Sequence, residues 1–265
     1  TPAQLVGDEG DGLKAMFTVM NHARIDVALQ GVAHAARAYT ISDAYAQERH
    51  QGRKPDGSEA TLADHADVRR MLDEQRALSL GARAMAHIAL VEMEKDDRPE
   101  LVEFLTPICK FFCSEAGIRA ADLGIQILGG YGYLTEYGVS QTWRDARIAS
   151  VYEGANGIHY HGLATRGLRA QGGAGADAFE ALIAELSQDA DVLDLLENWR
   201  SARAAVSAMQ DPSGVAYDFA QCTAYLFYRA VCAKFAAVGG TPEYARLSAF
   251  VASRPVTMPA LASAA

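Results

Sequence analysis

The tripeptide Tyr152-Glu153-Gly154 places a carboxylate between an aromatic ring and a glycine, at a predicted junction of a loop and a helix. Such a carboxylate can be held in a site from which water is excluded, where it acts as a general base. A solvent-exposed or helix-capping glutamate is the ordinary alternative, and the tripeptide taken alone favours that alternative. The residues that accompany Glu153 along the chain therefore decide between the two interpretations.

Two arginines and one glycine-rich segment are further candidates for binding residues. Arg24 lies within the first helical pattern and Arg49 closes it. The planar guanidinium of either could bind a phosphate or a carboxylate, although most arginines on helices lie in solvent. The segment Gly129-Gly130-Tyr131-Gly132 closes a helix and follows no strand. It is therefore predicted to be a helix cap with a turn rather than a dinucleotide-binding loop.

Neither the histidines nor the cysteines have the spacing of metal ligands. His159 and His161 are two positions apart, so they point in different directions if the segment is helical. The four cysteines lack the paired spacing of a zinc site or of a secreted disulfide scaffold, which predicts reduced thiols in the core: Cys109, Cys113, Cys222 and Cys232. We expect no metal ion.

The composition excludes several classes of partner. The chain has 265 residues, half of them hydrophobic, and a formal net charge of −9. An acidic protein lacks the positive field that attracts nucleic acid or an anionic membrane, so neither is an expected partner. No apolar run reaches the roughly 18 residues of a membrane span, and no signal peptide is visible. These features predict a cytoplasmic protein whose partners are small molecules.

The elements that must position these residues are predicted to be helices, so the expected fold class is all-α. Apolar residues recur at helical spacing from Leu13 onward, and short connections between the helices favour an up-down bundle of four. The expected helices span residues 13–48, 68–94, 101–129 and 156–169.

The segments between and after these helices are expected to be less regular. Residues 50–57 are polar and rich in residues that break helices, which predicts a loop. Residues 131–154 are predicted to be a structured loop with one helical turn at 143–148. Residues 171–176 have the composition of a flexible linker, and the helical pattern restarts after them. No segment has the alternation of a strand.

Several of these segments follow one another in an order that resembles the C-terminal half of the acyl-CoA dehydrogenase family. The resemblance covers residues 1 to 170, and the run from Gln126 to Gly154 is its most specific part. The matching segments are Arg24, Glu48-Arg49, Gln126-Ile127-Leu128-Gly129-Gly130-Tyr131-Gly132, Glu136-Tyr137, Arg144-Asp145-Ala146-Arg147-Ile148 and Tyr152-Glu153-Gly154.

The resemblance implies a division of the chain into three parts. Residues 1–12 would be the tail of a missing β domain, and residues 13–170 the C-terminal four-helix domain of the family. Residues 171–265 would be a helical extension, similar to that of the branch that includes 3-methylthiopropanoyl-CoA dehydrogenase. We expect this extension to pack between domains or subunits. The chain by itself is expected to be an inactive piece of the full enzyme.

The activity implied by the resemblance is the α,β-dehydrogenation of an acyl-CoA thioester to a trans-2-enoyl-CoA. Glu153 would be the catalytic base that removes the α-proton while FAD accepts a hydride from the β-carbon. Arg24 and Gly154 would contact the substrate. An electron-transfer flavoprotein is the implied electron acceptor.

The resemblance also implies a cofactor site that is shared between subunits. Arg49 would reach the pyrophosphate of FAD, while Gln126 and Gly130 would contact the adenosine part of a FAD bound mainly by a neighbouring subunit. A homodimer or homotetramer is therefore expected. Two other functions stay open at this point: an acyl-CoA oxidase, which returns electrons to oxygen, and a non-catalytic flavoprotein or assembly module of the same fold.

Overall fold

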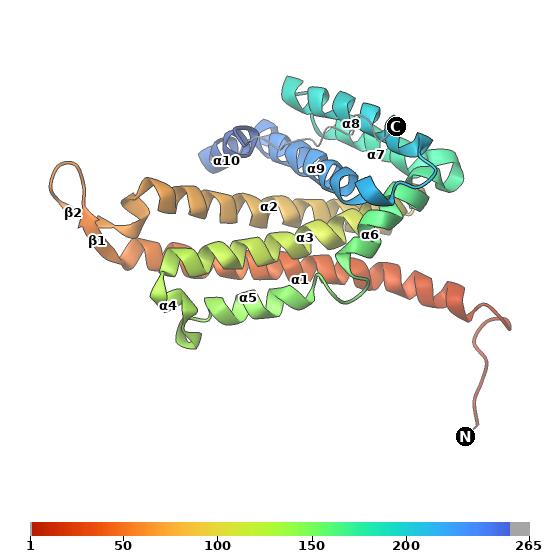
Figure 1. Cartoon of the computed structure of the whole chain (residues 1–265), viewed down its shortest axis with the longest axis horizontal. Coiled ribbons are helices and arrows are strands. Elements are labelled where there is room, and N and C mark those ends of the chain that lie inside the picture. The colour runs from red at the N-terminus through yellow and green to blue at the C-terminus, as the bar shows by residue number, and fades with distance from the viewer. Residues whose placement is uncertain (1, 255–265) are drawn as a thin grey trace.

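Three long helices, α1 (Gly12–Glu48), α2 (Ala66–Lys95) and α3 (Pro99–Leu128), run side by side and form the body of the molecule (Figure 1). The structure, a computed structural model, describes residues 2–254 apart from the side chains of residues 14, 17 and 18. Each of the three helices packs against the other two. The predicted all-α fold is confirmed, and the ends of these helices lie within two residues of the predicted ones.

The fourth helix of the bundle is α5 (Val139–Ile148), which packs against α1 and α3. The prediction placed only one helical turn here, starting at Trp143. The helix begins earlier because Gly138, at φ +75°, takes the left-handed conformation that turns the chain into it. Short segments α4 (Gly130–Tyr133) and η2 (Thr135–Tyr137) connect it to α3.

The predicted helix over residues 156–169 is confirmed, and it contains a π-helical turn. It consists of α6 (Asn156–Gly162) and a π-helical turn, η3 (Leu163–Gly167). Both pieces pack against α3 and α9. The wider turn brings Gly167 close to the ring of Phe104 on α3, where an added Cβ would lie 3.6 Å from the ring.

The predicted loop after α1 contains a small antiparallel hairpin that the sequence did not indicate. Its strands are β1 (His50–Arg53) and β2 (Glu59–Thr61), and a turn of helix-breaking residues joins them. Strands of four and three residues are too short to show alternation, which is why they were missed. A short 3-10 turn, η1 (Leu62–Asp64), follows, and its capping box joins Thr61 and Asp64.

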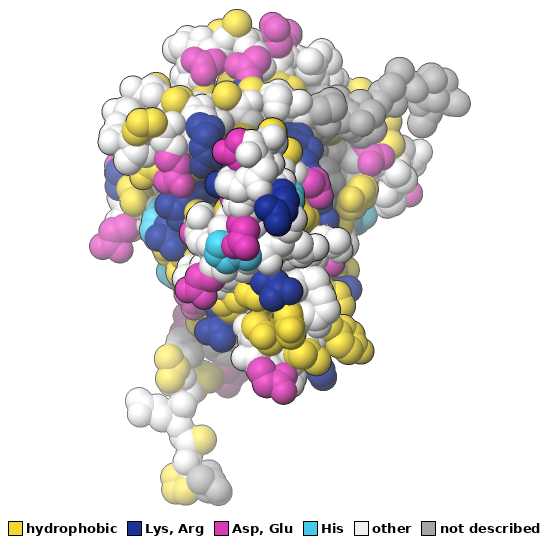
Figure 2. Space-filling model, turned by 90° about the vertical axis from the view of Figure 1, so that its left-hand side faces the viewer, with side chains coloured by type: hydrophobic (Ala, Val, Ile, Leu, Met, Phe, Trp, Pro, Cys, Tyr) yellow, Lys and Arg dark blue, Asp and Glu magenta, His cyan; other side chains and the backbone are white. Residues whose placement is uncertain are grey.

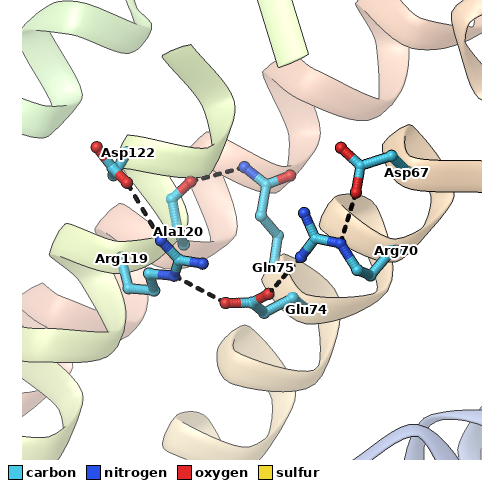
Figure 3. Close-up of polar contacts among 7 residues, drawn as sticks. All are labelled: Asp67, Arg70, Glu74, Gln75, Arg119, Ala120 and Asp122. Carbon is cyan, nitrogen blue, oxygen red and sulfur yellow. Dashed lines mark hydrogen bonds and ion pairs between the residues drawn. The ribbon is translucent and has the colours of Figure 1, made fainter. Parts of the chain in front are cut away.

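The bundle helices are also joined by polar contacts (Figure 3). The side-chain amide of the buried Gln75 on α2 donates to the Ala120 carbonyl on α3 at 2.7 Å and to Ser42 Oγ on α1 at 3.0 Å. On the surface nearby, Glu74 accepts from both Arg70 and Arg119. Exposed ion pairs contribute little to stability, so the buried amide is the more important of these contacts.

Helices α1 and α3 cross at two glycines, Gly31 and Gly117. A Cβ added to Gly31 would lie 2.1 Å from the Cys113 carbonyl oxygen, and one added to Gly117 would lie 2.8 Å from the Gly31 carbonyl oxygen. Backbones this close leave no room for a methyl group, so the crossing requires glycine.

We therefore expect Gly31→Ala to destabilise the protein by about 1–3 kcal/mol, the usual cost of overpacking a core. Denaturant unfolding followed by circular dichroism measures this difference. Gly214→Ala is the control, because a Cβ there meets no atom within 4 Å. Equal stability of the two variants would contradict the close crossing.

The described part of the expected extension forms four further helices that cover one side of the bundle, with α9 and α10 lying over α2 (Figure 1). Their core is continuous with that of the bundle, and it includes the fully buried Trp199. The helices are α7 (Ala174–Leu186), α8 (Ala190–Ala208), α9 (Ala216–Val238) and α10 (Pro242–Ala252), with short 3-10 turns η4 (Ala170–Gly173) and η5 (Ser213–Val215).

In the segment expected to be a flexible linker, residues 171–173 form a tight turn and residues 174–176 are the start of α7. Gln171, Gly172 and Gly173 all have positive φ there. Residue 1 of the expected β-domain tail and residues 255–265 of the expected extension lie outside the described residues.

Within residues 2–254, no helix combines the length and the apolar character needed to cross a bilayer. That part of the chain also holds no group of three or more His, Cys, Asp or Glu side chains arranged around a metal ion. The four cysteines are buried free thiols, as predicted.

Candidate active site

Glu153 lies on a turn between α5 and α6 whose backbone has an unusual conformation. Glu153 has φ +53° and Gly154 has φ +85°. The left-handed region disfavours residues with a Cβ, so the glutamate persists there only because its surroundings hold it. Gly154 has a second constraint, since an added Cβ would lie 3.1 Å from His159 Nε2. Glycine is the residue that this position accommodates without strain.

Hydrogen bonds from three helices hold the turn. The Tyr152 hydroxyl donates to Gln30 Oε1 on α1. His159 Nε2 on α6 lies 3.1 Å from the Glu153 carbonyl oxygen, and Lys110 Nζ on α3 lies 2.7 Å from that of Gly154. Three successive residues of the turn are thus tied to different parts of the bundle, so the direction of the Glu153 side chain is set by tertiary contacts.

His159 is a neutral hydrogen-bond donor in this arrangement. Its side chain is buried, and burial together with the charge of Lys110 lowers the pKa of the imidazole to about 4. The Glu153 carbonyl can only accept a hydrogen bond, so Nε2 carries the hydrogen. The ring therefore holds the turn at neutral pH without bringing a positive charge.

Arg24 lies on α1 beside the turn and lines a cavity of about 580 Å³. Its Nη1 donates to Asn21 Oδ1 at 3.1 Å, while its Nε is buried and has no partner among the described residues. Partial burial and the nearby Arg166 lower the pKa of Arg24, and the negative charge of Glu153 acts in the opposite direction. An arginine with an unused donor beside a second arginine is suited to bind an acceptor-rich or anionic group.

Glu153 itself is half-buried and is not part of the cavity wall. His159, which bonds its carbonyl, and Arg24, on which its charge acts, both line the cavity. The hydrophobic side chains of Ile148, Val151 and Ile158 near the turn are more than half exposed. Glu153 thus lies beside the cavity, with exposed apolar side chains close to it in the sequence.

The other predicted site residues gather at the far end of the bundle. Arg49, Gln126 and Gly130 all line a second cavity of about 410 Å³. The Arg49 guanidinium carbon lies 5.9 Å from the centre of the Tyr131 ring, and no carboxylate in residues 2–254 forms an ion pair with this arginine. A Cβ added to Gly130 would meet nothing within 4 Å, so the backbone there is open to a ligand.

The two groups of residues are far apart. Arg24 and Arg49 lie 25 positions apart on the single helix α1 and its C-cap (49 − 24 = 25), which corresponds to about 37 Å at 1.5 Å per residue. The structure therefore brings Glu153, Gly154 and Arg24 together at one site and Arg49, Gln126 and Gly130 together at another. One small ligand does not reach both.

Three residues that support the site were not identified from the sequence: Lys110, His159 and Asn156. Lys110 offered a signal, because it is a single charged residue within the apolar stretch Ile108-Cys109-Lys110-Phe111-Phe112 of a predicted core helix. His159 was considered only as a metal ligand. Asn156 offered no signal, since its role depends on partners more than 40 residues away.

The fold and the site define a helical-bundle domain that presents Glu153 as a candidate base beside a cavity lined by charged side chains of both signs. Comparison with known families then identifies the family: residues 10–168 match the family described as "Acyl-CoA dehydrogenase, C-terminal domain". Because this match covers more than half of the chain, the chain belongs to the acyl-CoA dehydrogenase family. The resemblance stated from the motifs is confirmed.

Among curated proteins, the chain is similar to 3-methylmercaptopropionyl-CoA dehydrogenase of Ruegeria pomeroyi, with 41% identity over 225 residues. This match covers 78% of the chain but only 38% of the relative. The chain thus spans well under half the length of that enzyme. A match that covers 78% of the chain must continue past residue 168, where the family match ends. Part of the extension is therefore shared with this relative.

Two solved structures have a similar fold over nearly the whole chain. Caenorhabditis elegans ACDH-11 in complex with C11-CoA gives a TM-score of 0.77 at 17% identity, covering 94% of this chain and 45% of that one. Acyl-CoA dehydrogenase from Bacillus anthracis complexed with FAD gives 0.72 at 20% identity, covering 92% and 47%. Both coverages extend past residue 168, so the C-terminal helices also occur in other members of this fold.

Proposed function

We propose that the full-length protein containing this chain oxidises an acyl-CoA thioester to its trans-2-enoyl-CoA, with Glu153 as the base. The observation that carries this proposal is the left-handed turn at Glu153, held by hydrogen bonds from α1, α3 and α6. Strained backbone that the surrounding structure maintains is concentrated at functional sites. Membership of the acyl-CoA dehydrogenase family supports the same role.

In the proposed reaction the Cα–H bond of the thioester breaks, and its proton moves to the Glu153 carboxylate. The electron pair left on Cα forms the new double bond as a hydride leaves Cβ. Thioester α-protons are very weakly acidic, so the negative charge that develops on the carbonyl oxygen must be stabilised. The backbone N–H of Glu153 is a suitable donor, because no acceptor in the described part of the chain takes it.

Arg24 and Gly154 are proposed to act on the substrate side of this site. Gly154 allows the turn to bring the base against the thioester, since a side chain there would displace His159. Arg24 contributes a buried, unpaired Nε–H and a positive charge beside the cavity. Its role is to orient the carboxylate and to attract the acyl-CoA.

FAD is the cofactor that the family and the second cavity support, and when bound it supplies the hydride acceptor. Arg49 has the bidentate donor group that a pyrophosphate requires, and Asp67, the carboxylate that lines the same cavity, is paired with Arg70 instead. Exposed Gln126 and the open backbone at Gly130 are suited to an adenosine. These three residues therefore fit the role that the motifs implied for them.

The separation of the two sites supports a homodimer or homotetramer. A FAD that contacts Arg49 lies too far along α1 to serve Glu153 of the same chain. Figure 2 looks onto the hairpin end of the molecule and shows hydrophobic side chains gathered on the lower part of that face. The exposed hydrophobic residues of the segment 130–137, which contacts Arg49 through Tyr131, are Tyr131, Tyr133, Leu134 and Tyr137. Such a patch is suited to a second subunit.

The electron acceptor distinguishes the dehydrogenase from the oxidase alternative. With the full-length enzyme, a panel of acyl-CoA thioesters that includes 3-methylmercaptopropionyl-CoA should reduce an electron-transfer flavoprotein and release little hydrogen peroxide. Enoyl-CoA formation is measured by chromatography, and peroxide by a coupled peroxidase assay. Stoichiometric peroxide would favour an oxidase, and absence of turnover with every thioester would favour a non-catalytic module. We propose that the enzyme acts in the cytoplasm, where its four free thiols stay reduced.

A further inference from the structure

Lys110 is a fully buried lysine in the middle of α3, and the proposed mechanism does not use it. Its Nζ donates to the Gly154 carbonyl at 2.7 Å and to Asn156 Oδ1 at 2.9 Å. No carboxylate of residues 2–254 lies within ion-pair distance of it. Burial and the charge of Arg24 lower its pKa to about 8. A buried ammonium without a salt bridge is costly, so it requires these two acceptors.

Both acceptors of Lys110 follow Glu153 closely along the chain. Gly154 is the next residue after Glu153, and Asn156 begins α6. The contact at the Gly154 carbonyl restrains the peptide between Gly154 and Ala155, directly after the two residues that have positive φ. Without this hydrogen bond, the backbone of the turn would be free to relax toward an ordinary conformation. That change would reorient the Glu153 side chain.

The buried polar chain continues beyond Asn156 to the C-terminal helices. Asn156 Nδ2 donates to Ser114 Oγ at 3.2 Å and to Glu115 Oε1 at 3.1 Å. Glu115 also accepts from the Tyr160 hydroxyl and, at 3.1 Å, from Gln221 Nε2 on α9. A continuous series of hydrogen bonds thus runs from the turn through α3 to α9.

We propose that Lys110 is a positioning residue for the Glu153 base, and that Gln221 on α9 supports it through Glu115 and Asn156. This inference rests on the proposed role of Glu153. Lys110 acts through the Gly154 carbonyl and does not contact the reacting atoms. These contacts give the C-terminal helices a specific role, since α9 supports the turn through Glu115 and Asn156.

The test is Lys110→Met in the full-length enzyme, which removes the donor and keeps most of the apolar stem. We expect kcat to fall roughly 10- to 100-fold, because a displacement of about 1 Å in a reacting group has effects of this size. KM and FAD content should change little. Exchange of the α-protons of a 3-thiaacyl-CoA in D2O, followed by NMR, should slow in parallel, since this exchange needs proton transfer by Glu153 without dehydrogenation.

Two further variants separate positioning from folding. Lys110→Gln retains a shorter donor and should lose less kcat than Lys110→Met. Gln221→Leu acts through two intervening residues, so it should displace Glu153 less. Its kcat should fall only about two- to fivefold. Thr106→Val is the matched control: Thr106 is a buried polar residue of α3 that bonds only the Val102 carbonyl, so kcat and exchange should stay unchanged.

The outcomes are distinct. Native kcat and native exchange in folded Lys110→Met would overturn the proposal, provided that Glu153→Gln is inactive. Should Glu153→Gln also be active, the proposed function itself fails. If Lys110→Met does not yield folded enzyme, the comparison of Lys110→Gln with Thr106→Val decides: equal kcat overturns the positioning role, and a selective loss in Lys110→Gln supports it.

Discussion

Replacing Glu153 by Gln in the full-length enzyme is expected to lower kcat about 10²- to 10⁴-fold, the range that a positioned general base contributes. The amide has nearly the shape of the carboxylate but accepts no proton, so the turn and the surrounding contacts should persist. Enoyl-CoA formation measures the loss, and the D2O exchange of a 3-thiaacyl-CoA measures proton transfer separately. Acyl-CoA binding and FAD content should stay close to native.

Glu94→Gln is the matched control for this substitution. Glu94 is exposed near the end of α2, far along the chain from the turn, and the same change there should leave kcat unchanged. Residual activity of Glu153→Gln above about a tenth of native would assign the base elsewhere, since it falls outside the range for a general base. The carboxylates that line the adjacent cavity, Glu100 and Glu103, would then be the next residues to substitute.

Gly154→Ala is expected to have the second largest effect, a loss of roughly 10²-fold in kcat/KM, as expected for displacement of a reacting group by about 1 Å. A Cβ at φ +85° is strained, and it would lie 3.1 Å from His159 Nε2. The turn must move to relieve the strained φ and the close contact with His159. This movement shifts Glu153 and weakens the hydrogen bond between His159 and the Glu153 carbonyl. Steady-state kinetics of the full-length enzyme measure the loss.

Gly239→Ala separates the effect of backbone strain from displacement of the base. Gly239 has φ +73° at the end of α9, and a Cβ there meets no atom within 4 Å. The variant should lose about 1–3 kcal/mol of stability from the strained φ, with unchanged kcat/KM. If Gly154→Ala and Gly239→Ala lost stability equally and both kept native kcat/KM, the turn at Glu153 would have no special role.

The long helices were predictable because their signal is local. Apolar residues at helical spacing mark the buried face of α1, α2 and α3, and prolines, glycines and charged runs mark their ends. The four cysteines were placed in the core by the same local pattern. Where the signal was short the prediction was wrong: α5 began at Val139 rather than Trp143, and the strands of the hairpin were not expected.

The family could also be recognised from the sequence, because the order of motifs from Gln126 to Gly154 is visible without any knowledge of tertiary contacts. The same motifs pointed to Glu153 and to the group formed by Arg49, Gln126 and Gly130. The structure brings that group together around one cavity. What each residue does in the reaction stays a prediction, and the variants above are its test.

Only the tertiary structure decided how Glu153 is held. The turn is fixed by Gln30, Lys110 and His159, and the first two of these are more than 40 residues from it along the chain. Backbone φ at Glu153 is likewise set by those distant contacts, because a glutamate by itself avoids that conformation. Sequence periodicity reports which face of a helix is buried, whereas packing determines which carbonyl a buried lysine meets.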